Sequence, residues 1–271
     1  MLKKLLLLFF LIPVECQREK TFYDISIFNG TKVEELSKYV NREDTTRISR
    51  FLREHPDVDI DTPDKEFGYS LLMWSIFNGK YKSFITLLRN HANPNYIGKK
   101  SQRLTPLYLS ATYIDNYYNT DDRYLNKLIE YGADPYLISH DTINQVDNNA
   151  IVASIGHLPY LKVFVEKCGV DVNSSFKNKS LVWNAVMLHN IDELHYLVVE
   201  KGASIDTIPR ATYIVINKGT RLDTIASSKK KYILIDIIKK YDFKNQPEKE
   251  KKKIEIINKY YQQHPQPEGQ V

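Results

Sequence analysis

A short phrase that ends helices recurs along the chain at spacings that restrict what the chain can fold into. Its clearest copy is Tyr-Gly-Ala-Asp-Pro at residues 131–135, directly after an amphipathic run at 124–130. Its third position, here called the exit position, occurs at spacings of 34, 41, 37 and 33 residues, at Val58, Ala92, Ala133, Val170 and Ala203. Self-similarity with a period of about 20–50 residues predicts a repeat array, in which each unit buries its apolar face against its neighbours.

Each unit reads as a turn, a helix, a second turn and a second helix. The third unit opens with Leu-Thr-Pro-Leu-Tyr-Leu-Ser-Ala at residues 104–111, where proline suits the first helical turn because its missing N–H is not needed there. Glycine after the second helix permits a left-handed turn, and in the second unit His91 takes its place. Helices are predicted from residue 33 onward, over 45–54, 70–76, 81–89, 124–130, 158–167 and 181–186, and in a sixth unit over 220–226 and 229–241.

These motifs resemble the ankyrin repeat family. Thr-Pro-Leu at 105–107 matches the family's Thr-Pro-Leu-His with Tyr108 in place of His, and residues 132–135 and 169–173 match its Gly-Ala-Asp-Val-Asn exit. Only one unit keeps Thr-Pro-Leu. The resemblance covers about residues 31–241. It implies an all-α, ankyrin-repeat solenoid of about five to six helix-turn-helix units, the last of which would be a polar C-terminal cap.

The N-terminus reads as a separate segment. In residues 1–16 two lysines precede an apolar run at 5–14, which is too short to span a bilayer but is typical of a signal peptide. A buried N-terminal helix is the alternative. Cys16 lies where a bacterial lipoprotein signal places its lipidated cysteine, yet Glu15 stands where that signal needs a small residue. Lipidation and ordinary cleavage therefore both stay open, and we expect export to the periplasm, either free or membrane-anchored.

The other segments are assigned from their composition. Residues 17–30 are an expected extended lead-in, 31–241 the repeat domain, and 242–271 a charged helical extension followed by a disordered tail. Two stretches interrupt the repeat: the tyrosine-rich residues 113–122 inside the third unit and residues 139–147 after it. Insertions in repeat proteins map to loops, which often carry binding surfaces.

The sequence does not indicate chemistry of its own. It has no nucleotide, hydrolase or metalloprotease motif, and no CxxC or Cys/His cluster for a metal. The net charge of +5 is modest and lies partly near the chain ends, so no nucleic-acid partner is inferred. Cys168 is expected to be a partly buried residue without a disulfide partner if Cys16 is lipidated or removed. We therefore expect no catalytic residue, no cofactor, no metal and no enzymatic activity.

A repeat array of this kind is expected to bind another protein through its concave face and loops. Tyrosine gives rigid contact area with a polar tip, and Trp74 is more typical of core packing. The candidate partner-binding residues border the expected groove or crowd the first insertion; they are Tyr69, Phe77, Asn78, Tyr113, Tyr117, Tyr118 and Met187.

The architecture also suggests a class of partner. Short exported ankyrin proteins of this shape resemble immunity proteins that neutralise antibacterial toxins, including phospholipase effectors of type VI secretion systems. The resemblance implies a lipase-type toxin as partner, occlusion as mechanism, and a free chain that is a monomer. The alternative is an envelope scaffold or stress-response protein with no toxin partner.

Overall fold

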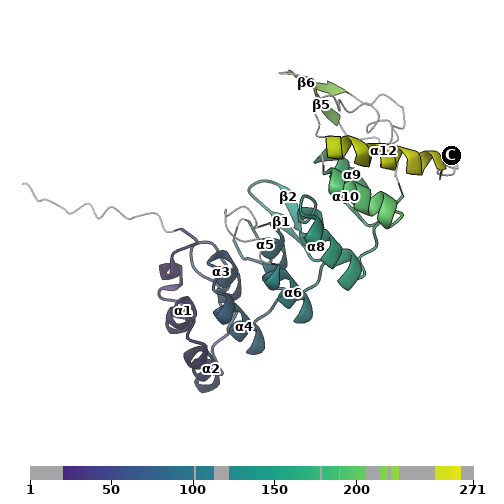
Figure 1. Ribbon diagram of the computed structural model, residues 1–271. Helices are drawn as coiled ribbons and strands as arrows, with labels where there is room; N and C mark the ends of the chain where they lie inside the picture. Colours follow the sequence, from purple (N-terminus) through teal and green to yellow (C-terminus); the bar gives the residue numbers. More distant parts are fainter. Residues whose placement is uncertain are drawn as a thin grey trace, which may run out of the picture.

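The computed structural model describes residues 21–100, 102–112, 122–177, 179–188, 190–204, 214–218, 221–225 and 248–263. These residues form a row of helix pairs that lie side by side along an elongated molecule (Figure 1). The pairs are α1 (Glu34–Asn41) with α2 (Thr45–Glu54), α3 (Leu71–Phe77) with α4 (Tyr81–Arg89), α5 (Pro106–Thr112) with α6 (Arg123–Glu130), α7 (Ala150–Ala153) with α8 (Leu158–Lys162), and α9 (Leu181–Met187) with α10 (Ile191–His195).

The described structure is thus a mostly helical repeat solenoid, as the spacing of the exit positions predicts. None of its described helices combines the length and apolarity needed to cross a membrane. The core runs along the row, and in the second to fifth units one residue in the C-terminal half of the second helix is fully buried. These residues are Leu87, Leu128, Phe164 and Leu197.

In the second to fifth units the first helix begins at a side chain that accepts a backbone N–H. Ser70 Oγ accepts from Met73 N at 3.4 Å, and Ser180 Oγ accepts from Trp183 N at 3.0 Å. In the third unit Thr105 Oγ1 accepts from Tyr108 N at 3.1 Å. Such caps satisfy amide groups that have no intrahelical partner, so these polar residues fix where each unit starts.

The fourth and fifth units differ from the second and third by a π-helical turn at the end of the second helix, in η3 (Val163–Lys167) and η4 (Tyr196–Glu200). In the second and third units the N–H of the exit residue donates to the carbonyl five residues earlier, in the pairs Ala92–Leu87 and Ala133–Leu128. In the fourth and fifth units it donates to the carbonyl six residues earlier, in the pairs Val170–Phe164 and Ala203–Leu197. One additional residue in each helix is therefore absorbed as a π-bulge, and the exit loop keeps its place.

A row of side chains links successive exit loops. Asn95 Oδ1 accepts from Asp134 N at 2.7 Å and its Nδ2 donates to Gly132 O at 2.9 Å. Asp61 accepts from Asn93 N, and Asn173 accepts from Ser204 N. Tyr136 holds the equivalent position between the third and fourth units and is 46% exposed. Its side chain has no amide or carboxylate, so among the described residues this position lacks the hydrogen bond that Asp61, Asn95 and Asn173 accept at theirs.

Short antiparallel hairpins correct the all-α expectation. They are β1 (Ile138–Asp141) with β2 (Val146–Asn149), β3 (Ser175–Phe176) with β4 (Lys179–Ser180), and β5 (Ile214–Lys218) with β6 (Arg221–Ile225). The first of them occupies the insertion at 139–147. Asp141 Oδ1 shapes its turn by accepting from the N–H groups of Ile143 and Asn144, at 2.8 and 3.0 Å.

The C-terminal part also departs from the expected sixth unit. Strand β6 lies where the first helix of that unit was predicted, so the prediction is wrong at residues 221–225, and residues 226–241 lie outside the described part. Helix α12 (Glu248–Gln263) instead packs against α10 and η4 (Figure 1). Ile254 and Ile257 are its buried residues, at 3% and 0% exposure, so α12 covers the open side of the fifth unit.

Candidate protein-binding groove

Tyr69, which the sequence suggested as a partner contact, is buried. It is 3% exposed and its ring lies 5.3 Å from the ring of Phe77. Its hydroxyl donates to Gln102 Oε1 at 2.6 Å, and burial raises its pKa to about 12. Tyr69 is therefore a core residue with a satisfied polar tip, and little of it is available to a partner.

Phe77 and Asn78 are covered by the chain's own N-terminal segment. The ring of Phe22, just before η1 (Ile25–Phe28), lies 4.8 Å from the ring of Phe77, which is 8% exposed. The side-chain amide of Asn78 donates to Trp74 O at 2.9 Å and to Phe22 O at 3.5 Å. The chain's own Phe22 therefore contacts both residues where a partner was expected. Trp74 is 1% exposed, which confirms it as a core residue.

The other predicted contacts divide into two groups. Met187 is half-buried and precedes Leu188, which is 55% exposed at the end of α9. Its contact with a partner stays a prediction. Cys16, Tyr113, Tyr117 and Tyr118 lie outside the described residues, so their roles also stay predictions.

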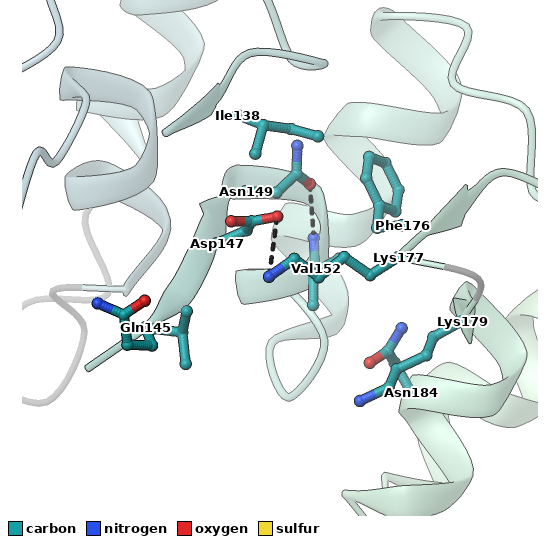
Figure 2. Close-up of a pocket in the computed structure, with 10 residues that line it drawn as sticks. Ile138, Gln145, Asp147, Asn149, Val152, Phe176, Lys177, Lys179 and Asn184 are labelled. Carbon is teal, nitrogen blue, oxygen red and sulfur yellow. Dashed lines mark hydrogen bonds and ion pairs between the residues drawn. The ribbon is translucent and has the colours of Figure 1, made fainter. Parts of the chain in front are cut away.

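Sequence reasoning missed a hollow between the hairpins of the fourth and fifth units. This hairpin hollow has a volume of about 290 Å³ (Figure 2). Hairpin β1–β2 forms one wall and the β3–β4 hairpin with α9 the other. Its lining residues are Ile138, Gln145, Val146, Asp147, Asn149, Val152, Phe176, Lys177, Lys179 and Asn184.

An acidic residue joins the two walls. Asp147 Oδ1 lies 2.8 Å from His140 Nδ1 across the first hairpin. Asp147 Oδ2 lies 3.1 Å from Lys177 Nζ on the second hairpin (Figure 2). The hydrogen bond with His140, followed by that with Lys177, lowers the pKa of Asp147. Both carboxylate oxygens are therefore engaged by nitrogen groups of this chain.

Asn149 fixes the floor of the hairpin hollow. Its Oδ1 accepts from the N–H groups of Ile151 and Val152, at 3.0 and 3.1 Å, and so caps α7. Its Nδ2 donates to Pro135 O at 3.3 Å. The side chain is 4% exposed, so Asn149 holds strand β2 to helix α7 and leaves the apolar Val152 on the lining.

Lys179 provides a second cation on the far wall. Its Nζ lies 4.5 Å from the centroid of the Trp183 ring, and the side chain is half-buried. Among the residues that the structure describes, no carboxylate lies within ion-pair distance of it. Packing on the indole face restricts the ammonium group while leaving it at the hollow.

Two lining residues have unusual backbone conformations. Gln145 and Lys177, at the turns of the two hairpins, have φ angles of 55° and 50°. Side-chain-bearing residues adopt such angles at a cost of order 1 kcal/mol or more. Both turns use a residue other than glycine at this conformation, so each turn carries a side chain to the hairpin hollow.

The described residues contain no group of three His, Cys, Asp or Glu residues that could hold a metal ion. Burial raises the pKa of the Cys168 thiol, which disfavours the nucleophilic thiolate. The hairpin hollow can instead bind, since it combines apolar walls with a few charged groups.

The comparisons with known proteins find likeness among solved structures and no match among families or curated sequences. Among solved structures, the chain is similar to the human ASB11 ankyrin repeat domain, at 18% identity over 62% of this chain and 69% of that chain, with a TM-score of 0.45. The solenoid is evident from its own helix pairs and exit spacings, and a likeness of this size does not indicate partners.

Proposed function

We propose that this chain is a protein-binding module and that the hairpin hollow with the adjoining β1–β2 hairpin receives the partner. The observation that carries this proposal is that three apolar side chains of the β1–β2 hairpin are exposed. Ile138, Ile143 and Val146 are 47%, 64% and 48% exposed. Single exposed apolar residues are ordinary, whereas several from one short hairpin beside a hollow are typical of an interaction site.

The distribution of packing along the groove supports the same place. At the N-terminal end, Phe22 covers Phe77 and Asn78. At the β1–β2 hairpin the described residues leave the apolar side chains uncovered. A partner that lies on this hairpin would bury apolar surface that is now in water, which is the main driving force of most protein association.

The finer proposal concerns the compartment and the class of partner. Residues 1–16 act as a signal peptide, and the chain works in the periplasm, either free or held at the membrane by a lipid on Cys16. There it is an immunity protein that binds an antibacterial toxin, such as a type VI secretion phospholipase effector, and occludes its active surface. The support for this is the sequence resemblance: a signal-like leader followed by a short ankyrin-like array.

The test is retention of a partner from extract of the native host by the tagged chain and by two matched variants. Ile143→Asp places a charge on the exposed hairpin, and Ile256→Asp places the same charge on α12, where Ile256 is 47% exposed. We expect one partner to be retained by the wild type and by Ile256→Asp and lost with Ile143→Asp. Equal retention by both variants would contradict the hairpin site.

Identification of that partner by mass spectrometry tests the finer proposal. A lipase or other toxin, whose lethality is suppressed when this chain is co-expressed in the periplasm, would support an immunity protein. A housekeeping envelope protein would instead indicate a scaffold.

Mass spectrometry of the mature N-terminus tests whether a lipid anchors the chain. A diacylglycerol-bearing Cys16 supports lipidation, and a free N-terminus at or after Gln17 excludes it.

A further inference from the structure

We propose that the hairpin hollow takes an extended partner segment in which an apolar side chain is followed closely by a carboxylate, and that Lys179 is the receptor of this carboxylate. This inference rests on the proposed function and adds the chemistry of the bound segment.

The charges of the hollow favour an incoming anion over an incoming cation. Its acidic residue, Asp147, is already engaged by His140 and Lys177, at 2.8 and 3.1 Å. A basic partner residue would have to displace one of these groups. Lys179 has no carboxylate within ion-pair distance among the described residues, so a partner carboxylate gains a charge-assisted hydrogen bond without breaking one.

The position of Lys179 suits this role. Its Nζ lies 4.5 Å from the centroid of the Trp183 ring, which is itself 7% exposed and therefore fixed in the core. The stem is half-buried. Less side-chain freedom is lost when a partially restricted lysine binds an anion, so the contact favours binding more than one to a fully exposed lysine would.

The apolar lining specifies what accompanies the carboxylate. Ile138 lies on the first hairpin, Phe176 on the second and Val152 on α7 (Figure 2). Val146, in β2, also lines the hollow. Ile138 and Val146 are about half exposed, at 47% and 48%, so an inserted aliphatic or aromatic side chain would remove their surfaces from water.

The size of the hollow favours an extended segment. Ligand pockets of drug-sized molecules span about 300–1,000 Å³, and this hollow is about 290 Å³. An α-helix with side chains is roughly 10–12 Å wide and would need a longer, wider groove. An extended segment can place one apolar side chain inside the hollow while the next side chain points away toward the rim and the one after it points back to the same side as the first. A carboxylate at either of these two positions can therefore lie near the inserted apolar group.

The test uses a random peptide library displayed on phage and selected against the full chain. We expect enriched peptides to share an apolar residue with Asp or Glu one or two positions away. A synthetic, fluorescently labelled copy of the leading peptide is then measured by anisotropy, beside a copy whose carboxylate is replaced by the amide. The amide copy is expected to bind about tenfold more weakly, in keeping with the loss of a hydrogen bond to a charged group.

Variants assign the effect to one lysine. Lys179→Gln should weaken the acidic peptide about tenfold and leave the amide copy unchanged, while Lys179→Arg should retain binding. Lys162→Gln is the matched control, because Lys162 Nζ also lies over an aromatic ring, at 5.1 Å from the centroid of Tyr196, and Lys162 does not line the hollow. Circular dichroism and thermal unfolding of each variant establish that it is folded.

The outcomes separate this inference from the proposed function. Enrichment of basic or uncharged peptides, or of none, would overturn it, as would equal binding of the two peptides. If Lys179→Gln has no effect while Ile143→Asp abolishes partner retention, the hairpin binds a protein by other chemistry and only the inference fails. If neither substitution matters, both fail.

Discussion

His91 and Gly132 have the same backbone conformation one unit apart, with φ angles of 67° and 85°. Each follows a second helix, and each donates its N–H to the carbonyl three residues earlier at 3.0 Å, to Leu88 and Ile129 respectively. Glycine adopts this left-handed conformation without the clash that a Cβ atom causes, so the second unit carries strain that the third does not.

We predict that His91→Gly stabilises the protein by about 0.5–1 kcal/mol, since the strain relieved exceeds the additional freedom that glycine gives the unfolded chain. The reverse change, Gly132→Ala, should destabilise by about 1 kcal/mol. A Cβ atom at Gly132 would meet no atom within 4 Å, so this cost is purely conformational. Urea unfolding curves of the two variants check the opposite signs, and shifts in the same direction would contradict the explanation.

The link between the first two exit loops predicts a pH dependence. Asp61 accepts from Asn93 N with both carboxylate oxygens, at 3.1 and 3.0 Å. Burial raises the pKa of Asp61 to about 6, against the lowering effect of that hydrogen bond and with a small contribution from Asp59. The folded state therefore holds this proton more tightly than the unfolded state, and the stability that Asp61 contributes is present at low pH and lost as the pH rises from about 4 to 6.

We predict that Asp61→Asn increases stability at pH 7 relative to the wild type, with a smaller gain at pH 4.5. The amide retains an acceptor oxygen for Asn93 N, as Asn95 and Asn173 do in equivalent links, and it carries no charge. Unfolding free energies at the two pH values give the measurement, with Asp57→Asn as the exposed control. A gain of equal size at both pH values would rule out the titration of Asp61 as its cause.

The same row of links predicts a graded effect of removing its amides. Asn95 makes two hydrogen bonds to the third unit, with Asp134 N and Gly132 O, whereas Asn173 makes one to the fifth, with Ser204 N. A net contribution of about 1 kcal/mol per bond predicts losses of roughly 2 kcal/mol for Asn95→Ala and roughly 1 kcal/mol for Asn173→Ala. Thermal unfolding can rank the two variants, and the opposite order would show that these bonds do not set unit-to-unit stability.

The repeat was predictable because its determinants are local. The polar caps, the apolar positions and the glycine after the second helix in the third to fifth units are all read within one unit, and the predicted helix at residues 45–54 has the bounds observed for α2. Residue counts also indicate the π-bulges. Compared with the second unit, the fourth and fifth units have one additional residue between the turn that joins the two helices and the glycine after the second helix, Gly169 or Gly202.

The groove was less predictable because it depends on contacts between distant segments. Nothing local to Phe77 shows that Phe22, 55 residues earlier, covers it. The hairpin at 138–149 was foreseen only as an insertion, since its Ser, His, Asn and Asp residues lack the β-branched pattern of a strand. The cluster Asp-Thr-Ile-Asn-Gln at 141–145 is the one local signal that could have indicated its turn.

The C-terminal helix provides the last prediction. Ile257 on α12 is fully buried against the fifth unit, while its neighbour Ile256 is 47% exposed. We predict that Ile257→Asp destabilises the protein by about 3 kcal/mol or more, because it places an unpaired charge in a core contact, and that Ile256→Asp has little effect. Hydrogen exchange should then rise in α10 and η4, which α12 covers, and stay unchanged in α1 to α4 at the other end of the row. A uniform rise along the whole chain would show that α12 supports global folding instead of covering the last unit alone.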